Sequence, residues 1–308
     1  MPSTEDLVVQ PPRSVTFRVH IDRAMWVGGV RGLMLQALHP LAMRGVWQNS
    51  DFQDDPFGRL RRTADFVGRV TFGGPADADE IGRRVRDIHR RLRIKDPDTG
   101  RTHRVDDPEL LLWVHCAEVS SYLEVARRGG LRLTDRQADR YFAEQRRSAA
   151  YVGLHAEDVP GSAAEMAAYF AEVRPRLRVT PEAAATVRFL LWPRLPARLR
   201  FLNPGKPLYF PFGALCYLTL PRWARDMYGV LPEIPSAAVT AALKAWRLGL
   251  NALPEPLHDH AFMPATRAML TASRERLAAA GYDTSKGLKG LTDPRRWPTQ
   301  ASARPSQD

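Results

Sequence analysis

A histidine on a predicted amphipathic helix is the first residue of this sequence that could do chemistry. The stretch from about Asp77 to Arg93 carries apolar residues at helical spacing, and His89 lies at the edge of their stripe. The stripe consists of Ile81, Val85, Ile88 and Leu92. One interpretation is a core histidine that hydrogen-bonds to a carbonyl oxygen. The other is an axial ligand of haem iron, because haem takes a neutral imidazole, apolar side chains against its ring and cations for its propionates, and this arginine-rich helix contains all three.

The preceding predicted helix carries a guanidinium and a hydroxyl on one face. Arg59 and Thr63 are four residues apart, and Phe66, Val67 and Val70 continue that face. Such a pair above apolar side chains could position dioxygen or a carboxylate by hydrogen bonding. A solvated surface is the competing explanation, since three arginines fall within four residues here.

Two further histidines are candidates for an internal site. His39 precedes Pro40, which pushes the backbone of His39 out of the α region and lets its side chain point into the interior; a simple helix terminator explains the pattern equally well. His115 and Glu118 are three residues apart on another predicted helix, where an internal pair is the default interpretation. A metal site there would need further ligands.

Other metal and catalytic signatures are weak or absent. A di-iron bundle needs two Glu-x-x-His segments on helices, whereas the sequence has one, Glu255 to His258, interrupted by Pro256. Covalent haem would need C-x-x-C-H, which does not occur. The segment from Phe210 to Cys216 is one residue short of a haem-thiolate loop. The hydrolase, Walker and dinucleotide-binding motifs are also missing.

The elements that must position these residues are helices. Helical periodicity recurs along the chain and period-two alternation hardly appears, so the sequence predicts an all-α fold. N-cap residues followed by proline, and capping boxes, mark several helix starts. The expected helices cover about 24–39, 55–72, 77–93, 107–128, 236–250 and 264–280, with others starting at about Thr134, Ser162 and Thr180. Eight prolines between Trp192 and Pro235 predict short helices and loops there.

Composition excludes several classes of protein. The chain has 308 residues, with 45 Lys+Arg against 34 Asp+Glu, a formal charge of +11. The 40 arginines are spread over almost every predicted helix, whereas a nucleic-acid binder concentrates its charge on a motif, so we expect no nucleic-acid partner. Cys116 and Cys216 cannot supply a disulfide framework or a thiolate zinc cluster. The N-terminus lacks an apolar signal segment and the most apolar stretch, 24–47, is interrupted by charges, so we expect a cytoplasmic protein without a transmembrane segment.

Four ordered segments together resemble the MpaB-type oxygenase family, which shares its catalytic domain with rubber oxygenase, the latex clearing protein. The first is Leu-Gln-Ala-Leu-His-Pro-Leu-Ala-Met-Arg-Gly-Val at 35–46, and the second runs from Phe52 through Asp55-Pro56 to Arg59 and Thr63. The third is 85–89, ending at His89, and the fourth is 107–115. The resemblance is strong over roughly 17–153 and fainter to about Gly229. It implies a globin-like all-α core that binds haem b without a covalent link.

The resemblance also implies roles for individual residues. His89 matches the axial histidine, and Arg59 and Thr63 match the family's Arg-x-x-x-Thr element near the haem. Arg62 falls where rubber oxygenase has a lysine that can reach the iron, and a guanidinium cannot deprotonate to do the same. Rubber oxygenase has a glutamate base upstream of this element, whereas 38–53 here contains none, and only His39 and Asp51 could take its place.

These observations give one expectation for function and two alternatives. We expect a haem b oxygenase that uses dioxygen and a small intracellular organic substrate, with His89 on the iron. Arg59, Thr63 and His39 would be catalytic, and Arg59, Arg62 and His115 would contact the cofactor. The alternatives are a haem-binding protein that stores or senses without turnover, and an all-helical nucleic-acid-binding regulator. For the domains we expect an extension over 1–16, a catalytic domain over 17–283 and a loosely ordered polar tail over 284–308.

Overall fold

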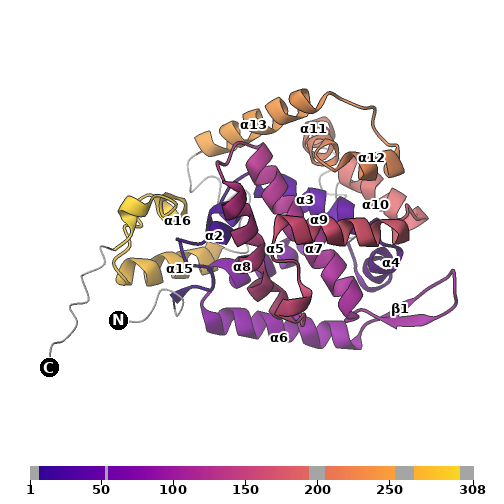
Figure 1. Cartoon of the computed structure of the whole chain (residues 1–308), viewed down its shortest axis with the longest axis horizontal. Helices are drawn as coiled ribbons and strands as arrows, with labels where there is room; N and C mark the ends of the chain where they lie inside the picture. The colour runs from indigo at the N-terminus through magenta and orange to yellow at the C-terminus, as the bar shows by residue number, and fades with distance from the viewer. Residues whose placement is uncertain (1–6, 53–54, 194–204, 254–266, 299–308) are drawn as a thin grey trace.

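The computed structural model describes residues 7–52, 55–193, 205–253 and 267–298 (Figure 1). Helices dominate this part of the chain, which confirms the predicted all-α fold, and its only strands form a short antiparallel hairpin of β1 (Arg93–Lys95) and β2 (Thr102–Arg104). The α-helices are α2 (Val15–His20), α3 (Met25–Gln36), α4 (Pro40–Asn49), α5 (Pro56–Phe72), α6 (Pro75–Arg91), α7 (Pro108–Arg128), α8 (Asp135–Ala150), α9 (Ala163–Val173), α10 (Pro181–Leu191), α11 (Gly205–Leu218), α12 (Arg222–Tyr228), α13 (Ser236–Ala252), α15 (Arg267–Ala279) and α16 (Gly287–Gly290). Short 3-10 turns occupy Ala156–Asp158, Arg174–Arg176 and Pro294–Arg296.

The predicted helix starts are confirmed at the level of single hydrogen bonds. In each case the N-cap side chain accepts from a backbone N–H of the first turn, which no residue within the helix can satisfy. The Asp55 carboxylate accepts from Gly58 N at 2.9 Å, and the Thr134 hydroxyl accepts from Gln137 N at 3.2 Å. The other N-caps that accept in this way are Asp107, Ser162 and Thr180.

The proline-rich middle of the chain differs from the expectation of short helices alone. Helix α11 has 14 residues and contains Pro211. Its packing against α10 is close, because a Cβ on Gly213 would lie 2.7 Å from the carbonyl oxygen of Leu190. We attribute the persistence of the helix to this packing, which can override the cost of an internal proline. Residues 194–204 of this stretch, and the start of the helix predicted at Pro264, lie outside the described residues.

The closest helix pair at the centre of the fold is α3 and α7. Gly28 and Gly32, one turn apart, face α7: a Cβ on Gly28 would lie 3.0 Å from the Tyr122 ring, and one on Gly32 would lie 3.4 Å from the Glu118 Cα. The two helices therefore pack closely at both glycines, and most tightly at Gly28. The main apolar core continues from α3 through Trp113 of α7 to α10, α11 and α13.

The remaining helices surround this pair (Figure 1). Helix α6 runs along one edge of the molecule and packs against α5, and α13 lies across the opposite edge. Helices α15 and α16 lie together at one side, where α15 packs against α5. Within the described residues, no helix is both long and apolar enough to cross a membrane.

The C-terminal region differs from the loosely ordered tail expected from Thr284. Residues 284–298 include α16, and Leu288 and Leu291 are 4% and 0% exposed in a cluster with Phe17, Phe72 and other apolar residues. These two leucines fix α16 to the body of the fold despite the polar residues around them. Residues 299–308 lie outside the described part of the chain. The domain boundaries themselves stay a prediction.

Candidate functional site

The larger of two adjoining cavities lies between α3, α5, α6 and α7 and has a volume of about 390 Å³. This volume is within the range of about 300–1,000 Å³ that is typical of small-molecule and cofactor sites. Its lining is largely apolar and includes Trp26, Leu33, Leu60, Phe66, Val67, Val85 and Val114. The predicted continuation of the Arg59 face is thus confirmed for Phe66 and Val67, whereas Val70 packs in a separate cluster with Val9.

His89 lines this cavity, and of the apolar stripe on its helix Val85 does so too. The stripe is less buried than its spacing predicts, since Ile88 is 47% exposed. The reason is the position of α6 at the edge of the molecule, where only one side of the helix is covered. The Nδ1 atom of His89 is buried and has no hydrogen-bond partner in the described structure. Burial lowers the pKa of His89; the Asp106 carboxylate opposes this shift and the charge of Arg59 supports it. The imidazole is therefore neutral at pH 7, the form that binds a metal.

His20, the second histidine that lines the larger cavity, has both ring nitrogens occupied. Nδ1 pairs with Thr71 Oγ1 at 2.9 Å, and Nε2 pairs with Tyr141 Oη at 3.1 Å. Binding iron would break one of these buried hydrogen bonds, whereas His89 would lose none at Nδ1. Between the two, the structure favours His89 as the residue able to hold a metal or haem iron.

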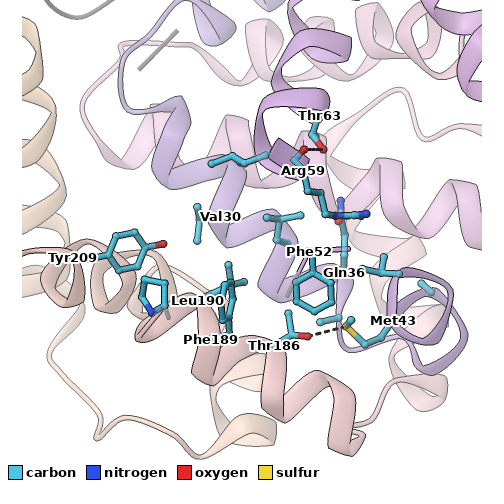
Figure 2. Close-up of a pocket in the computed structure, with 16 residues that line it drawn as sticks. Val30, Gln36, Met43, Phe52, Arg59, Thr63, Thr186, Phe189, Leu190 and Tyr209 are labelled. Atoms are coloured by element: carbon cyan, nitrogen blue, oxygen red, sulfur yellow. Dashed lines mark hydrogen bonds between the residues drawn. The ribbon is translucent and has the colours of Figure 1, made fainter. Parts of the chain in front are cut away.

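The smaller cavity, of about 110 Å³, shares part of its wall with the larger one. The shared residues are Leu33, Gln36, Arg59, Leu60 and Thr63. Figure 2 shows Arg59 and Thr63 at one end of the smaller cavity, with Phe52, Met43, Phe189 and Tyr209 arranged around the space beyond them. Most of its other lining is apolar: Val30, Ala37, Ala42, Val46, Leu190 and Pro193, with Thr186 as a polar addition.

Arg59 is half-buried, and its Nη1 donates to Ser50 Oγ at 2.8 Å, which fixes the guanidinium between α4 and α5. Thr63 Oγ1 donates to the carbonyl oxygen of Arg59 at 3.2 Å. Arg62 also lines the larger cavity, but its exposed guanidinium forms ion pairs with Asp51 at 2.7 Å and Asp55 at 3.8 Å. Arg59 and Thr63 therefore present polar atoms between the two cavities, while Arg62 is neutralised at the surface.

His39 and His115 line neither cavity. The backbone of His39 is extended (φ −85°, ψ 116°), as the following proline predicts, and its Nδ1 accepts from Ala42 N at 3.4 Å, so it acts as the N-cap of α4. His115 is buried on α7, and its Nε2 has no partner in the described structure. The expected pairing of His115 with Glu118 is not formed, because Glu118 instead accepts from the Tyr122 hydroxyl at 2.7 Å.

Some residues of the larger cavity were not identified from the sequence, and Glu118 was considered only as the partner of His115. Glu118 and Tyr122 line it, and burial raises the pKa of Glu118, although the hydrogen bond from Tyr122 opposes the shift. Arg23 and Lys289 line it as well. The arginines of α6, expected as propionate partners, lie elsewhere: Arg86, for example, donates to the carbonyl oxygen of Tyr151. The glycine spacing of α3 is the sequence signal that could have indicated a close partner helix, but it does not name α7.

The described residues contain no group of three His, Cys, Asp or Glu side chains placed to hold a metal ion. The Glu255–His258 segment lies outside the described residues. Both cysteines are buried as free thiols. Burial raises the pKa of Cys216, which disfavours the thiolate that a metal or haem iron would need.

Comparison with known proteins adds two findings. A family model described as "ER-bound oxygenase mpaB/B'/Rubber oxygenase, catalytic domain" matches residues 17–252. A solved structure of latex clearing protein LCP in the closed state is similar to this one, with a TM-score of 0.53 and 18% identity, over 85% of this chain and 73% of that chain. At that identity the likeness concerns the fold alone. No curated protein matches the chain.

Proposed function

The chain belongs to the mpaB and rubber oxygenase catalytic-domain family, and from this premise we propose that it is a haem b-dependent oxygenase of a small, largely apolar organic substrate. The observation that carries the proposal is the position of His89 beside a cavity of about 390 Å³. Its imidazole is neutral, and the buried Nδ1 atom has no hydrogen-bond partner in the described structure. Apolar side chains on both sides of that cavity suit the faces of a macrocycle. When bound, haem would activate dioxygen.

The residues around the larger cavity would hold and shield the cofactor. His89 would bind the iron, and Phe66, Val67 and Val85 would exclude water from the cofactor. A dry site strengthens each hydrogen bond and charge interaction inside it. Of the residues predicted to contact the cofactor, Arg59 and Arg62 line this cavity. His115 lies on α7 and lines neither cavity, so it would affect the cofactor through packing and not by contact.

The smaller cavity would bind the substrate. Arg59 and Thr63 line both cavities, so they would face dioxygen and the substrate together. The guanidinium would act as a hydrogen-bond donor, and the Thr63 hydroxyl, whose proton goes to the carbonyl oxygen of Arg59, would act as an acceptor. The mostly apolar remainder favours an uncharged substrate. His39 would be a positioning residue, because as N-cap of α4 it holds the helix whose Ala42, Met43 and Val46 line this space.

Two measurements test this function. Protein purified from cells supplied with haem precursor should contain haem b close to one per chain in a pyridine haemochrome assay. With a reductant and a panel of small apolar alkenes, it should consume oxygen faster than the same protein with reductant alone. Haem uptake without substrate-dependent oxygen consumption would favour storage or sensing, and failure to bind haem would exclude both functions.

A further inference from the structure

Two cations from distant parts of the chain converge on one edge of the larger cavity. Arg23 precedes α3 and Lys289 lies on α16, and both line the cavity. The C-terminal end of α13 holds both of them. Arg23 Nη1 donates to the carbonyl oxygen of Leu250 and, at 2.7 Å, to that of Leu253, and Lys289 Nζ donates to Asn251 Oδ1 at 2.5 Å. Three acceptors within four residues of one helix end thus fix two positive charges beside the same space.

Among the described residues, Arg23 gives this edge a positive charge that no carboxylate compensates. Asp22, the neighbouring carboxylate, forms an ion pair with Arg247 at 2.7 Å, so its charge is already compensated. Arg23 is 8% exposed, and in the described structure its hydrogen bonds go to carbonyl oxygens and it forms no ion pair. A buried guanidinium on a cavity wall favours an anionic group within hydrogen-bond reach.

Lys289 is held in place by the packing of α16. Leu288 and Leu291, on either side of it, are almost fully buried. The Trp297 indole N–H donates to the carbonyl oxygen of Leu291 at 2.8 Å, which ties the last described turn to the helix. This segment lies beyond residues 17–252, the part of the chain that matches the family model. The chain therefore brings a cation to the cavity from outside that catalytic domain.

We propose that Arg23 and Lys289 bind the carboxylate edge of the cofactor, an inference that rests on the proposed haem function. Haem b is an apolar ring with two propionates on one side, and the larger cavity is an apolar space with two cations on one edge and His89 on its wall. Arg62 is a weaker candidate, because it is exposed and paired with Asp51 and Asp55. The α16 segment would cover this edge of the cofactor site and contribute Lys289 to it.

The test compares haemin with haemin dimethyl ester, whose carboxylates are neutral, in the full-length protein. Lys289→Met removes the charge, Lys289→Arg keeps it, and Lys286→Met is the matched control at an exposed position of the same segment that does not line the cavity. We expect the wild type and Lys286→Met to bind haemin at least about tenfold more tightly than the diester, in line with the strength of charge-assisted hydrogen bonds. In Lys289→Met this ratio should fall about tenfold, and Lys289→Arg should recover most of it.

The dissociation rate of haemin into excess apomyoglobin is a second readout, and it should rise in Lys289→Met with unchanged circular dichroism. An unchanged haemin-to-diester ratio in Lys289→Met, or an equal loss in Lys286→Met, would overturn the inference while leaving the proposed function intact. If the wild type binds neither haemin nor its diester, both fall.

Discussion

Arg59 and Thr63, one helical turn apart on α5, line both cavities at the same time. The Thr63 hydroxyl donates to the carbonyl oxygen of Arg59 at 3.2 Å, and the Arg59 guanidinium donates to Ser50 at 2.8 Å. The two side chains are therefore held in the wall that the two cavities share. Together with Gln36, they form a polar junction between the two cavities.

Removing the guanidinium at this junction should weaken the binding of a small anion next to the iron. In the haem-loaded protein we expect Arg59→Met to lower the affinity for azide by about tenfold or more, the effect of losing a hydrogen bond from a charged group. Thr63→Val should leave the affinity for azide nearly unchanged, because the Thr63 hydroxyl already donates its proton to the carbonyl oxygen of Arg59 and offers an anion no donor. A spectroscopic azide titration measures both effects.

The matched control for this titration is Arg69→Met. Arg69 lies on the same helix, forms an ion pair with Asp65 at 3.1 Å and lines neither cavity. Its azide affinity should equal that of the wild type. Equal losses in Arg59→Met and Arg69→Met would mean that the effect comes from the net charge of α5 and not from the junction.

Filling the smaller cavity should abolish its capacity for apolar molecules without affecting cofactor binding. Val46 lines the smaller cavity but not the larger one. We expect benzene or indole to raise the melting temperature of the wild type and of Val46→Ala, because a ligand that binds only the folded state stabilises it. Val46→Phe should show no such rise while its haem content stays unchanged. A rise of equal size in Val46→Phe would show that these molecules bind elsewhere.

The contact of α3 with α7 should make adjacent glycines respond differently to alanine. Gly28→Ala would place a Cβ 3.0 Å from the Tyr122 ring and 3.1 Å from the Tyr122 Cα, so we expect it to lower the free energy of unfolding by about 1–3 kcal/mol. At Gly29 the nearest atom would be 3.8 Å away, an ordinary contact. Gly29→Ala should therefore be neutral or stabilising by up to about 1 kcal/mol through helix propensity. Urea unfolding of both variants checks the difference.

Acid should destabilise the fold through its buried histidines. Burial lowers the pKa of His20 to about 3 and that of His39 to about 4. Between these values and the ordinary 6.5 the unfolded chain binds more protons than the folded chain, so stability is complete above about pH 6.5 and is lost as the pH falls. Each such histidine adds up to about 1.4 kcal/mol per pH unit to the slope.

The His20→Gln variant tests this assignment. The variant should lose stability at pH 7 because its hydrogen bonds to Thr71 and Tyr141 change. Its free energy of unfolding should also depend less steeply on pH between 6 and 4 than that of the wild type, by up to one proton. A slope identical to that of the wild type would show that His20 is not a source of the acid sensitivity.

Local signals made most helices predictable, because capping hydrogen bonds and proline positions act within a few residues. Asp55 and Thr134 illustrate this, since each caps the helix that its spacing predicts. Helix α4 shows the limit: Pro40 is equally consistent with the end of one helix and the start of the next, and the structure has α4 beginning there. Whether α11 persists through Pro211 depends on its packing against α10, which the local sequence does not encode.

The site was predictable only where its residues belong to a local helical pattern. His89, Arg59 and Thr63 follow from helical spacing and from the family resemblance, and all three line the larger cavity. Glu118 was linked to the wrong partner, because spacing alone cannot distinguish a neighbour at i−3 from one at i+4. Lys289 could not be connected to His89 at all, since only tertiary packing brings α16 to the cavity.

The central claim is that His89 holds haem iron in the larger cavity, and the most direct test is the absorption spectrum of the His89→Gly variant with and without imidazole. The account predicts a Soret band and about one haem b per chain in the wild type, and loss or a shift of the band in His89→Gly. Added imidazole should restore the wild-type band by replacing the missing side chain, and His115→Gly should resemble the wild type. A His89→Gly spectrum identical to that of the wild type before imidazole is added would contradict the account.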